Sequence, residues 1–453
     1  MLDSLLAVND AINEIVWGPP FLVLLVGTGI YLTFRLNFFQ FTHFKLSWKQ
    51  SFGRYFSKEA EEEGGVLSSF QAISSAMAAT LGVGNIAGVS TALSLGGPGA
   101  IFWMWVSALF GMATKFAEAQ LGIKYREEHG EDDFTGGVMY YIQNGMGGKW
   151  KWLAVLYAFF AGIAAFGIGN MVQSNTLAHA AEDGFAIPTW VTGVVVVFFV
   201  GLVIIGGVKR IGKVAEKLVP LMAIFYFVGG GLIIILNIGA VPAVFADIFS
   251  SAFTGSAAVG GFAGATVRMA VRFGVARGVF SNEAGLGAAS IIHAQARNKP
   301  TRQGMWGIWE VIIDTLVVGT ITALVVLLTG ALETGETGAV LASEGFTMGL
   351  PGPGGYIINI SIIVFAFTTM LTWSFYGEES WRYIFGKKIV MPYRFVFLGL
   401  LFVGAIGALE PIWLLADTLN GLMAAPNLIA LIVLAGVIVK EKDDYMDELT
   451  RSA

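Results

Sequence analysis

Long apolar stretches recur along the whole chain, and they constrain its fold more than any other feature. Many are long enough to cross a bilayer, for which about 20 predominantly apolar residues suffice. Only 13% of the residues are charged, whereas a soluble domain averages about 25%. We therefore expect an all-α polytopic membrane protein in contact with the lipid bilayer.

The apolar pattern predicts about eleven transmembrane helices. They lie near residues 20–36, 66–94, 98–122, 152–178, 188–208, 214–238, 257–293, 304–330, 355–385, 392–408 and 412–439. Residues 1–18 carry apolar side chains on one helical face, which favours an interfacial amphipathic helix. The span in 19–36 is expected to be an addition to the repeated core described below.

Basic residues predict the orientation of these spans. Every second loop carries Lys or Arg, and the loops between them carry neither. Basic loops stay in the cytosol in most membrane proteins. The pattern places the N-terminus outside the cell membrane, and the C-terminal tail, residues 441–453, in the cytosol.

Two short segments in different halves of the chain resemble each other. "GNIAGVSTA" (Gly84–Ala92) and "SNEAGLGAA" (Ser281–Ala289) both read Asn-x-Ala-Gly followed by small residues. An odd number of spans separates the copies, so they enter the membrane from opposite sides. This predicts an inverted repeat of five helices each, residues 65–240 and 245–440. Matched Gly-interrupted spans indicate a transporter site; the alternative is that the glycines only allow close helix packing.

An interrupted helix can bind ligands through its backbone. Gly82 and Gly84 allow the chain to leave the helix, which frees carbonyl and amide groups. Freed carbonyls suit a small cation, and freed amides at the start of a half-helix suit a carboxylate. Asn85 offers an oxygen to the cation or an N–H to the anion.

A cation shell is predicted between the first break and the span near 355–385. The hydroxyls of Thr368, Thr369 and Thr372 lie within about one turn and would complete a shell begun by the carbonyls of Ala78 and Leu81. The alternative is that these hydroxyls bond back to their own helix, as Thr often does in spans. The sequence does not select among the threonines.

Further residues are candidates for the substrate pocket and for gating. Phe273, beside Gly274 in the second interrupted span, would form an apolar wall, or ordinary core, and Trp373 would close the pocket. Asn170 and Gln173 are expected to face the cavity from the span near 152–178. Charged residues within spans are costly unless paired or hydrated, so four others are gate or coupling candidates: Arg268, Arg272, Glu283 and Asp417. Asp417 pairs with one of the two arginines, or all three line a vestibule. Glu310 and Asp314 are candidates for structural pairing or proton-sensitive coupling.

Three motifs resemble those of the alanine or glycine:cation symporter family. They are "GVGNIAGV" (Gly82–Val89), "TGGVMYYI" (Thr135–Ile142) and "RGVFSNEAGLGAAS" (Arg277–Ser290), and the similarity extends through nearly all of the chain. The resemblance implies a leucine-transporter-like fold and uptake of alanine or glycine with sodium (Na+), sometimes with protons.

The resemblance also implies where the ligands bind. The substrate is expected between two broken helices, at breaks near Gly82 and Gly274. Contacts to its carboxylate carry over to Thr80, Gly82, Val83, Gly84 and Asn85, and the cation site to Ala78 and Leu81 with the threonines named above.

Other functional classes fit the sequence less well. No HExxH or GxSxG motif occurs and cysteine is absent, so the chain is not expected to be an enzyme. A net charge of −5 does not suggest a nucleic-acid partner. The prediction is sodium-coupled symport of small neutral amino acids; the alternatives are proton coupling on the same fold and a passive channel. Substrate preference, stoichiometry and oligomeric state stay open, and a monomer is compatible with the sequence.

Overall fold

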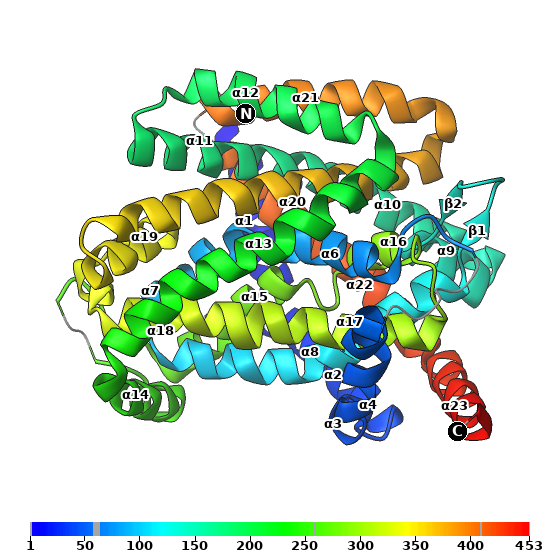
Figure 1. Cartoon of the computed structure of the whole chain (residues 1–453), viewed down its shortest axis with the longest axis horizontal. Coiled ribbons are helices and arrows are strands. Elements are labelled where there is room, and N and C mark those ends of the chain that lie inside the picture. The colour runs from blue at the N-terminus through cyan, green and yellow to red at the C-terminus, as the bar shows by residue number, and fades with distance from the viewer. Residues whose placement is uncertain (1, 58–63, 258–259, 408–409, 453) are drawn as a thin grey trace.

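The computed structural model describes residues 2–57, 64–257, 260–407 and 410–452, and these residues are almost entirely helical (Figure 1). The expectation of an all-α membrane protein is confirmed. The strands within the described ranges form one small hairpin, in which β1 (Glu127–Glu128) pairs antiparallel with β2 (Phe134–Thr135).

The N-terminal segment forms two long helices followed by short ones. They are α1 (Leu2–Val16), α2 (Pro19–Arg35), α3 (Phe39–Thr42), α4 (Phe44–Trp48), the π-helical η1 (Lys49–Gly53) and α5 (Arg54–Ser57). Pro19 and Pro20 occupy the first turn of α2, where a missing N–H costs nothing. The predicted helix at 1–18 exists, but its place at a membrane interface stays a prediction.

The first half of the core runs to Leu236. Its helices are α6 (Ser69–Thr80), η2 (Gly84–Gly88), α7 (Val89–Gly96), α8 (Gly99–Lys124), α9 (Val138–Tyr140), η3 (Tyr141–Met146), η4 (Gly148–Trp150), α10 (Lys151–Phe166), η5 (Gly167–Met171), α11 (Val172–Phe185), α12 (Thr189–Ile204) and α13 (Gly207–Leu236).

The second half continues to the C-terminus. Its helices are η6 (Ile238–Ala240), α14 (Val241–Thr254), α15 (Val267–Asn282), α16 (Ala289–His293), α17 (Pro300–Val311), η7 (Ile312–Gly319), α18 (Thr320–Leu328), η8 (Ala331–Thr334), α19 (Gly338–Gly349), α20 (Pro353–Phe385), η9 (Lys387–Ile389), α21 (Val390–Ile406), α22 (Glu410–Val433) and α23 (Ala435–Ser452). The predicted tail at 441–453 is thus largely part of a helix that begins at Ala435.

Eight helices of the described chain are long and apolar enough to cross a membrane, or nine if the bent pair α6–α7 is one span. α12 is apolar but has only 16 residues, and α15 carries three arginines. The expected count of eleven therefore stays a prediction. Large apolar side chains are exposed on α12 and α13, including Phe198 and Leu221, as a lipid-facing surface requires.

The first predicted break is confirmed. α6 ends at Thr80, and the chain resumes as the π-helical η2 at Gly84, with a bend of 47° between the two halves. Ser68 caps the start of α6 by accepting a hydrogen bond from the Gln71 amide at 3.0 Å. The helix is therefore regular from its capped start to Thr80, and the interruption is confined to the residues between Thr80 and Gly84.

The second break lies at the end of the stretch expected to hold it, "RFGVARGVFSNEAG" (Arg272–Gly285), and not near Gly274. α15 continues through Gly274 to Asn282, and the chain turns at Glu283, whose φ is 56°. Gly285 and Gly287 follow with φ of 103° and 80°. The expected break near Gly274 was wrong, because a Cβ at Gly274 would run into the Ala100 carbonyl of α8. Its role is close helix packing.

Candidate functional site

The first break and α20 gather oxygen atoms at one place. The Thr369 hydroxyl lies within hydrogen-bond distance of two carbonyl oxygens, that of Ala78 at 3.1 Å and that of Phe365 in its own helix at 2.9 Å. A Cβ added to Gly82 would lie 2.6 Å from the same hydroxyl. Leu81 ends the helix with ψ of 82°, so its carbonyl leaves the helical direction. The predicted cation ligands Ala78 and Thr369 are thus in contact, and Leu81 is adjacent.

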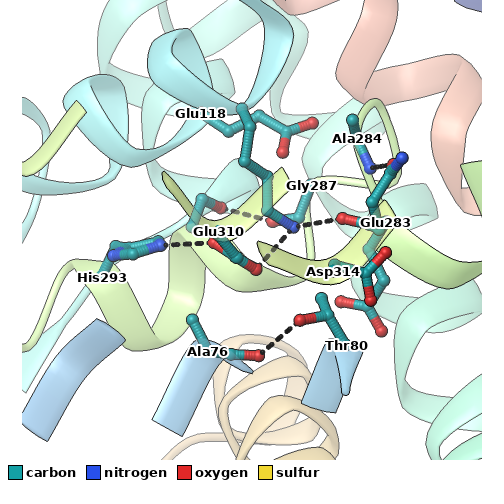
Figure 2. Close-up of polar contacts among 12 residues, drawn as sticks. Ala76, Thr80, Glu118, Glu283, Ala284, Gly287, His293, Glu310 and Asp314 are labelled. Carbon is teal, nitrogen blue, oxygen red and sulfur yellow. Dashed lines mark hydrogen bonds and ion pairs between the residues drawn. The ribbon is translucent and has the colours of Figure 1, made fainter. Parts of the chain in front are cut away.

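The other two threonines point elsewhere. The Thr372 hydroxyl donates to the Ser75 carbonyl at 2.9 Å, about one turn before Ala78 on α6. The Thr368 hydroxyl contacts the Met222 sulfur of α13 at 3.5 Å and bonds back to its own helix. Thr369 is therefore the hydroxyl nearest the break. Thr80, predicted to contact the substrate, donates to the Ala76 carbonyl at 3.4 Å (Figure 2).

Asn85 is fully buried and uses its amide to hold the break. Its oxygen accepts from the Gly82 amide at 3.0 Å. Its nitrogen donates to the Asp314 carboxylate at 2.7 Å and to the Asp314 carbonyl at 3.1 Å. The side chain, predicted to touch substrate or ion, bonds here to the loop and to η7.

A small cavity of about 220 Å³ lies beside the first break. Val83 and Gly84, both predicted to contact substrate, form part of its wall. The rest comes from η2, α7, α11, α15 and α19: Ala87, Gly88, Thr91, Val172, Gln173, Thr176, Arg277, Phe280, Gly338 and Ala339. The cavity is therefore bounded by both interrupted helices.

Gln173 provides a free acceptor at this cavity. Its amide nitrogen donates to the Ile168 carbonyl at 3.0 Å, and its buried oxygen has no partner. Asn170, the predicted substrate contact, instead donates to the Phe397 carbonyl of α21 at 2.6 Å. The structure thus brings Gln173, rather than Asn170, to the cavity.

Phe280 takes the place predicted for Phe273. Both lie on α15, seven residues apart and so on similar faces. Phe273 lies close to Gly96 and under the Arg272 guanidinium, outside the cavity. Because α15 continues beyond Gly274, the aromatic wall of the cavity lies two turns later.

Trp373 connects α20 to the second break. Its indole N–H donates to the Glu283 carboxylate at 3.1 Å, and it is almost completely buried. A Cβ added to Gly169 would clash with the Trp373 ring. Trp373 therefore packs α20 against η5 and binds Glu283 at the second break. It is not among the residues that line the cavity.

The ion pair predicted for Asp417 forms with a different arginine. Arg277 lies 3.6 Å from the Asp417 carboxylate, and Asn13 of α1 donates to the same carboxylate at 3.2 Å. Arg268 and Arg272 line an apolar groove beside α2 and α8 instead. The expected pairing with either of them was wrong, because the α15 residue that faces α22 is Arg277.

Sequence reasoning missed a lysine at the centre of the bundle. Lys115 of α8 is fully buried, pairs with Glu310 at 3.0 Å and donates to the Asn282 carbonyl at 2.9 Å. The signal was present, because Lys115 and Glu118 lie inside a predicted span, where charges are rare and functional.

A second cavity, about 420 Å³ in volume, opens near the hairpin and the end of α20. Asp133 pairs there with Arg382 at 2.6 Å and with Lys387 at 2.8 Å. Burial acts to raise the pKa of Asp133, but hydrogen bonds from Lys387 and Arg382 outweigh it and lower the pKa. Arg394 forms a bidentate pair with Glu378.

Comparison with known proteins identifies relatives over the whole chain. The sequence model of the sodium:alanine symporter family matches residues 2–453. The sodium/alanine symporter AgcS of Methanococcus maripaludis is 48% identical over 95% of this chain and 95% of that protein. A putative sodium/proton-dependent alanine carrier protein of Bacillus subtilis, YrbD, is 37% identical over 96% of this chain and 91% of its own.

The fold also has solved counterparts. MhsT in complex with L-phenylalanine superposes with a TM-score of 0.59 at 14% identity, covering 84% of this chain and 93% of that one. At this identity the likeness concerns the fold alone, which is leucine-transporter-like.

Proposed function

The chain belongs to the sodium:alanine symporter family, and from this we propose that it imports small neutral amino acids, alanine or glycine, together with Na+. The family and the fold are those of a membrane transporter and not of an enzyme. One observation carries the proposal: the Thr369 hydroxyl meets the Ala78 carbonyl at the break whose next residues line a small cavity.

Sodium is proposed to bind at these oxygens. Carbonyl and hydroxyl oxygens are hard ligands suited to a small cation. When Na+ enters, the Thr369 hydroxyl turns its oxygen to the ion in place of donating to Ala78. The ion would tie α20 to the carbonyl end of α6, and so stabilise one arrangement of the two helices.

The amino acid is proposed to occupy the cavity of about 220 Å³. Its carboxylate would lie at Val83 and Gly84, at the positive end of the half-helix formed by η2 and α7. Its ammonium would donate to the unpartnered oxygen of Gln173, and its side chain would meet Phe280. Pockets for drug-sized ligands measure about 300–1,000 Å³, so this volume favours a small amino acid.

Transport would follow by alternating access, with one helix bundle rocking against the other. Each Na+ that enters gains about 2.3 kcal/mol per 100 mV of membrane potential. That energy supports roughly fiftyfold accumulation of the substrate.

Proton coupling is the second candidate, because the relative YrbD is described as a sodium/proton-dependent carrier. Uptake of labelled alanine into proteoliposomes separates the possibilities. A sodium gradient alone should drive accumulation; accumulation driven only by a pH gradient would replace Na+ with H+, and flux that only runs downhill would indicate a channel.

A further inference from the structure

The bundle centre holds more carboxyl groups than cations. Glu118, Glu283, Glu310 and Asp314 surround the ammonium group of Lys115, and each side chain is at least 96% buried. Figure 2 shows Glu118 of α8, Glu283 in the turn after α15, and Glu310 and Asp314 of the continuous α17–η7 helix in one place. Charges at this depth are stable only when they are balanced or neutralised.

His293 connects Glu310 to Gln303. Gln303 presents its amide nitrogen to His293 Nδ1 at 2.7 Å, because the Gln303 oxygen accepts from Asn298 at 2.8 Å. The other ring nitrogen, Nε2, lies 3.1 Å from the Glu310 carboxylate. Lys115 is the ammonium group that interacts with all four acids.

Two of the four acids are well balanced. Glu310 bonds to Lys115 and to His293. Asp314 accepts hydrogen bonds from Asn85 at 2.7 Å, from Thr315 at 2.7 Å and from Ser281 at 3.3 Å. Donors directed at a carboxylate favour its ionised form.

The other two acids each have a buried oxygen without a partner. Glu118 Oε1 accepts from Gly285 and Asn427, and its Oε2 accepts from nothing. Glu283 Oε1 accepts from Trp373 alone, and its Oε2 is also bare. Glu283 thus has the fewest donors of the four, and its ionised form is the least stabilised.

We propose that Glu283 is a proton-binding site, and that the proton on its bare oxygen must be present for the amino acid to bind. This inference rests on the proposed function. The step is the protonation of the Glu283 carboxylate by a proton from the solvent, which gives the neutral carboxylic acid and requires no other reactant.

Charged and titratable groups face Glu283 from five neighbouring elements. They are Lys115 and Glu118 on α8, Glu310 and Asp314 on α17 and η7, Tyr157 on α10 and Tyr376 on α20. Three of these groups are carboxyls and one is an ammonium already bound to Glu310. Ionising Glu283 therefore adds a negative charge to a cluster that is already rich in them.

Glu283 lies two residues after Ser281, which packs against Gly84 of the cavity wall. It forms the turn after α15, and a Cβ at Gly84 would lie 3.4 Å from the Cα of Ser281 near the end of the same helix. An ionised Glu283 would repel the substrate carboxylate and favour an open, hydrated second break. The protonated form should therefore bind the amino acid more tightly.

The test is calorimetry of alanine binding to the purified full-length protein in saturating Na+, over about pH 5.5 to 9. Two buffers of different ionisation enthalpy report the protons taken up. We expect the affinity of the wild type to weaken by up to about tenfold per pH unit at the alkaline end, where about one proton is taken up per alanine bound. No proton uptake at any pH would overturn the inference.

Two variants assign the site. Glu283→Gln should bind alanine with an affinity that no longer depends on pH and without proton uptake. Glu118→Gln, which alters the other bare carboxyl, should keep the pH dependence of the wild type. A Glu283→Gln variant that retains the dependence, or a Glu118→Gln variant that loses it, would overturn the assignment. If Glu283→Gln does not fold, the proton count of the wild type still decides whether alanine binding takes up a proton, and Glu118→Gln decides whether Glu118 is the group that binds it.

The outcome separates this inference from the proposed function. Alanine binding that requires Na+ but is unaffected by pH would overturn the proton site alone. Absence of alanine binding at every pH would overturn both.

Discussion

Asn85 and Asp314 join the first break to η7 through a buried hydrogen bond of 2.7 Å. The second break is tied to η7 in a similar way, because the Asn282 amide donates to the Thr315 hydroxyl at 3.0 Å. The asparagines of the two Asn-x-Ala-Gly motifs therefore donate hydrogen bonds to two consecutive residues of η7, Asp314 and Thr315. This observation explains why asparagine occurs in both copies: each oxygen caps its own break and each nitrogen binds η7.

We first predict that Asn85 and Asp314 are coupled in stability. Asn85→Ala leaves a buried carboxylate with one donor fewer, which costs about 1–3 kcal/mol. Asp314→Asn in the same protein should remove much of that penalty. A double-mutant cycle from thermal unfolding in detergent should show a coupling of about 1 kcal/mol or more. Additive effects would mean that the bond contributes little.

A second prediction concerns sodium. Thr369→Ala removes the hydroxyl that meets the Ala78 carbonyl, so the Na+ concentration needed for half-maximal alanine binding should rise about tenfold, equivalent to about 1.4 kcal/mol. Thr369→Ser keeps the hydroxyl and should restore most of the affinity. Thr368→Ala is the matched control, because its hydroxyl faces Met222. Equal effects at both positions would argue against a single ligating hydroxyl.

The first break could be predicted from sequence because several signals agree there. Gly82 and Gly84 lower helix stability, and Asn85 introduces a polar group that needs partners. The second break was misplaced because Gly274 and Gly278 suggest the same instability. A glycine that breaks a helix and a glycine that allows a neighbouring helix to approach look the same in sequence and differ only in their surroundings. Here Gly274 lies against the Ala100 carbonyl of α8, and Gly278 lies against the Ser107 hydroxyl of the same helix.

Partners across the bundle were harder to predict than breaks. The gate pair depends on which face of α15 meets α22, and a shift of five residues, from Arg272 to Arg277, changes the partner. Glu283 was identified as a costly charge, but Lys115 beside it was overlooked. Pairing between residues of distant helices depends on which helix faces pack together, and that could not be inferred from the pattern of residues along this chain.

A third prediction tests the pair of Arg277 and Asp417 as a gate. Because the chain has no cysteine, Thr176→Cys places a unique thiol on the cavity wall. Adding Asp417→Asn should speed its reaction with a membrane-impermeant maleimide severalfold, since the pair that closes the path is lost. Arg272→Gln is the control and should leave the rate unchanged, because Arg272 lines the separate groove. A faster reaction in both variants would point to general loosening.

The fourth prediction concerns the link between the hairpin and α20. Asp133→Asn weakens the contacts to Arg382 and Lys387, so a single cysteine at Val66, which lines the second cavity, should react faster with maleimide. Asp132→Asn is the matched control. Its pair with Lys209 is exposed on both sides, and such pairs contribute little.

The pH dependence of this link follows from the lowered pKa of Asp133. A group whose pKa is lowered on folding stabilises the structure above its ordinary pKa, about 4 for Asp, and the effect is lost as the pH falls through the lowered value. Labelling of the Val66→Cys variant with Asp133 intact should therefore be constant between about pH 6 and 8, apart from the reactivity of the thiol itself. Only in strong acid should its labelling rate approach the rate measured when Asp133→Asn is added. A change near neutral pH that Asp133→Asn does not abolish would place the controlling group elsewhere.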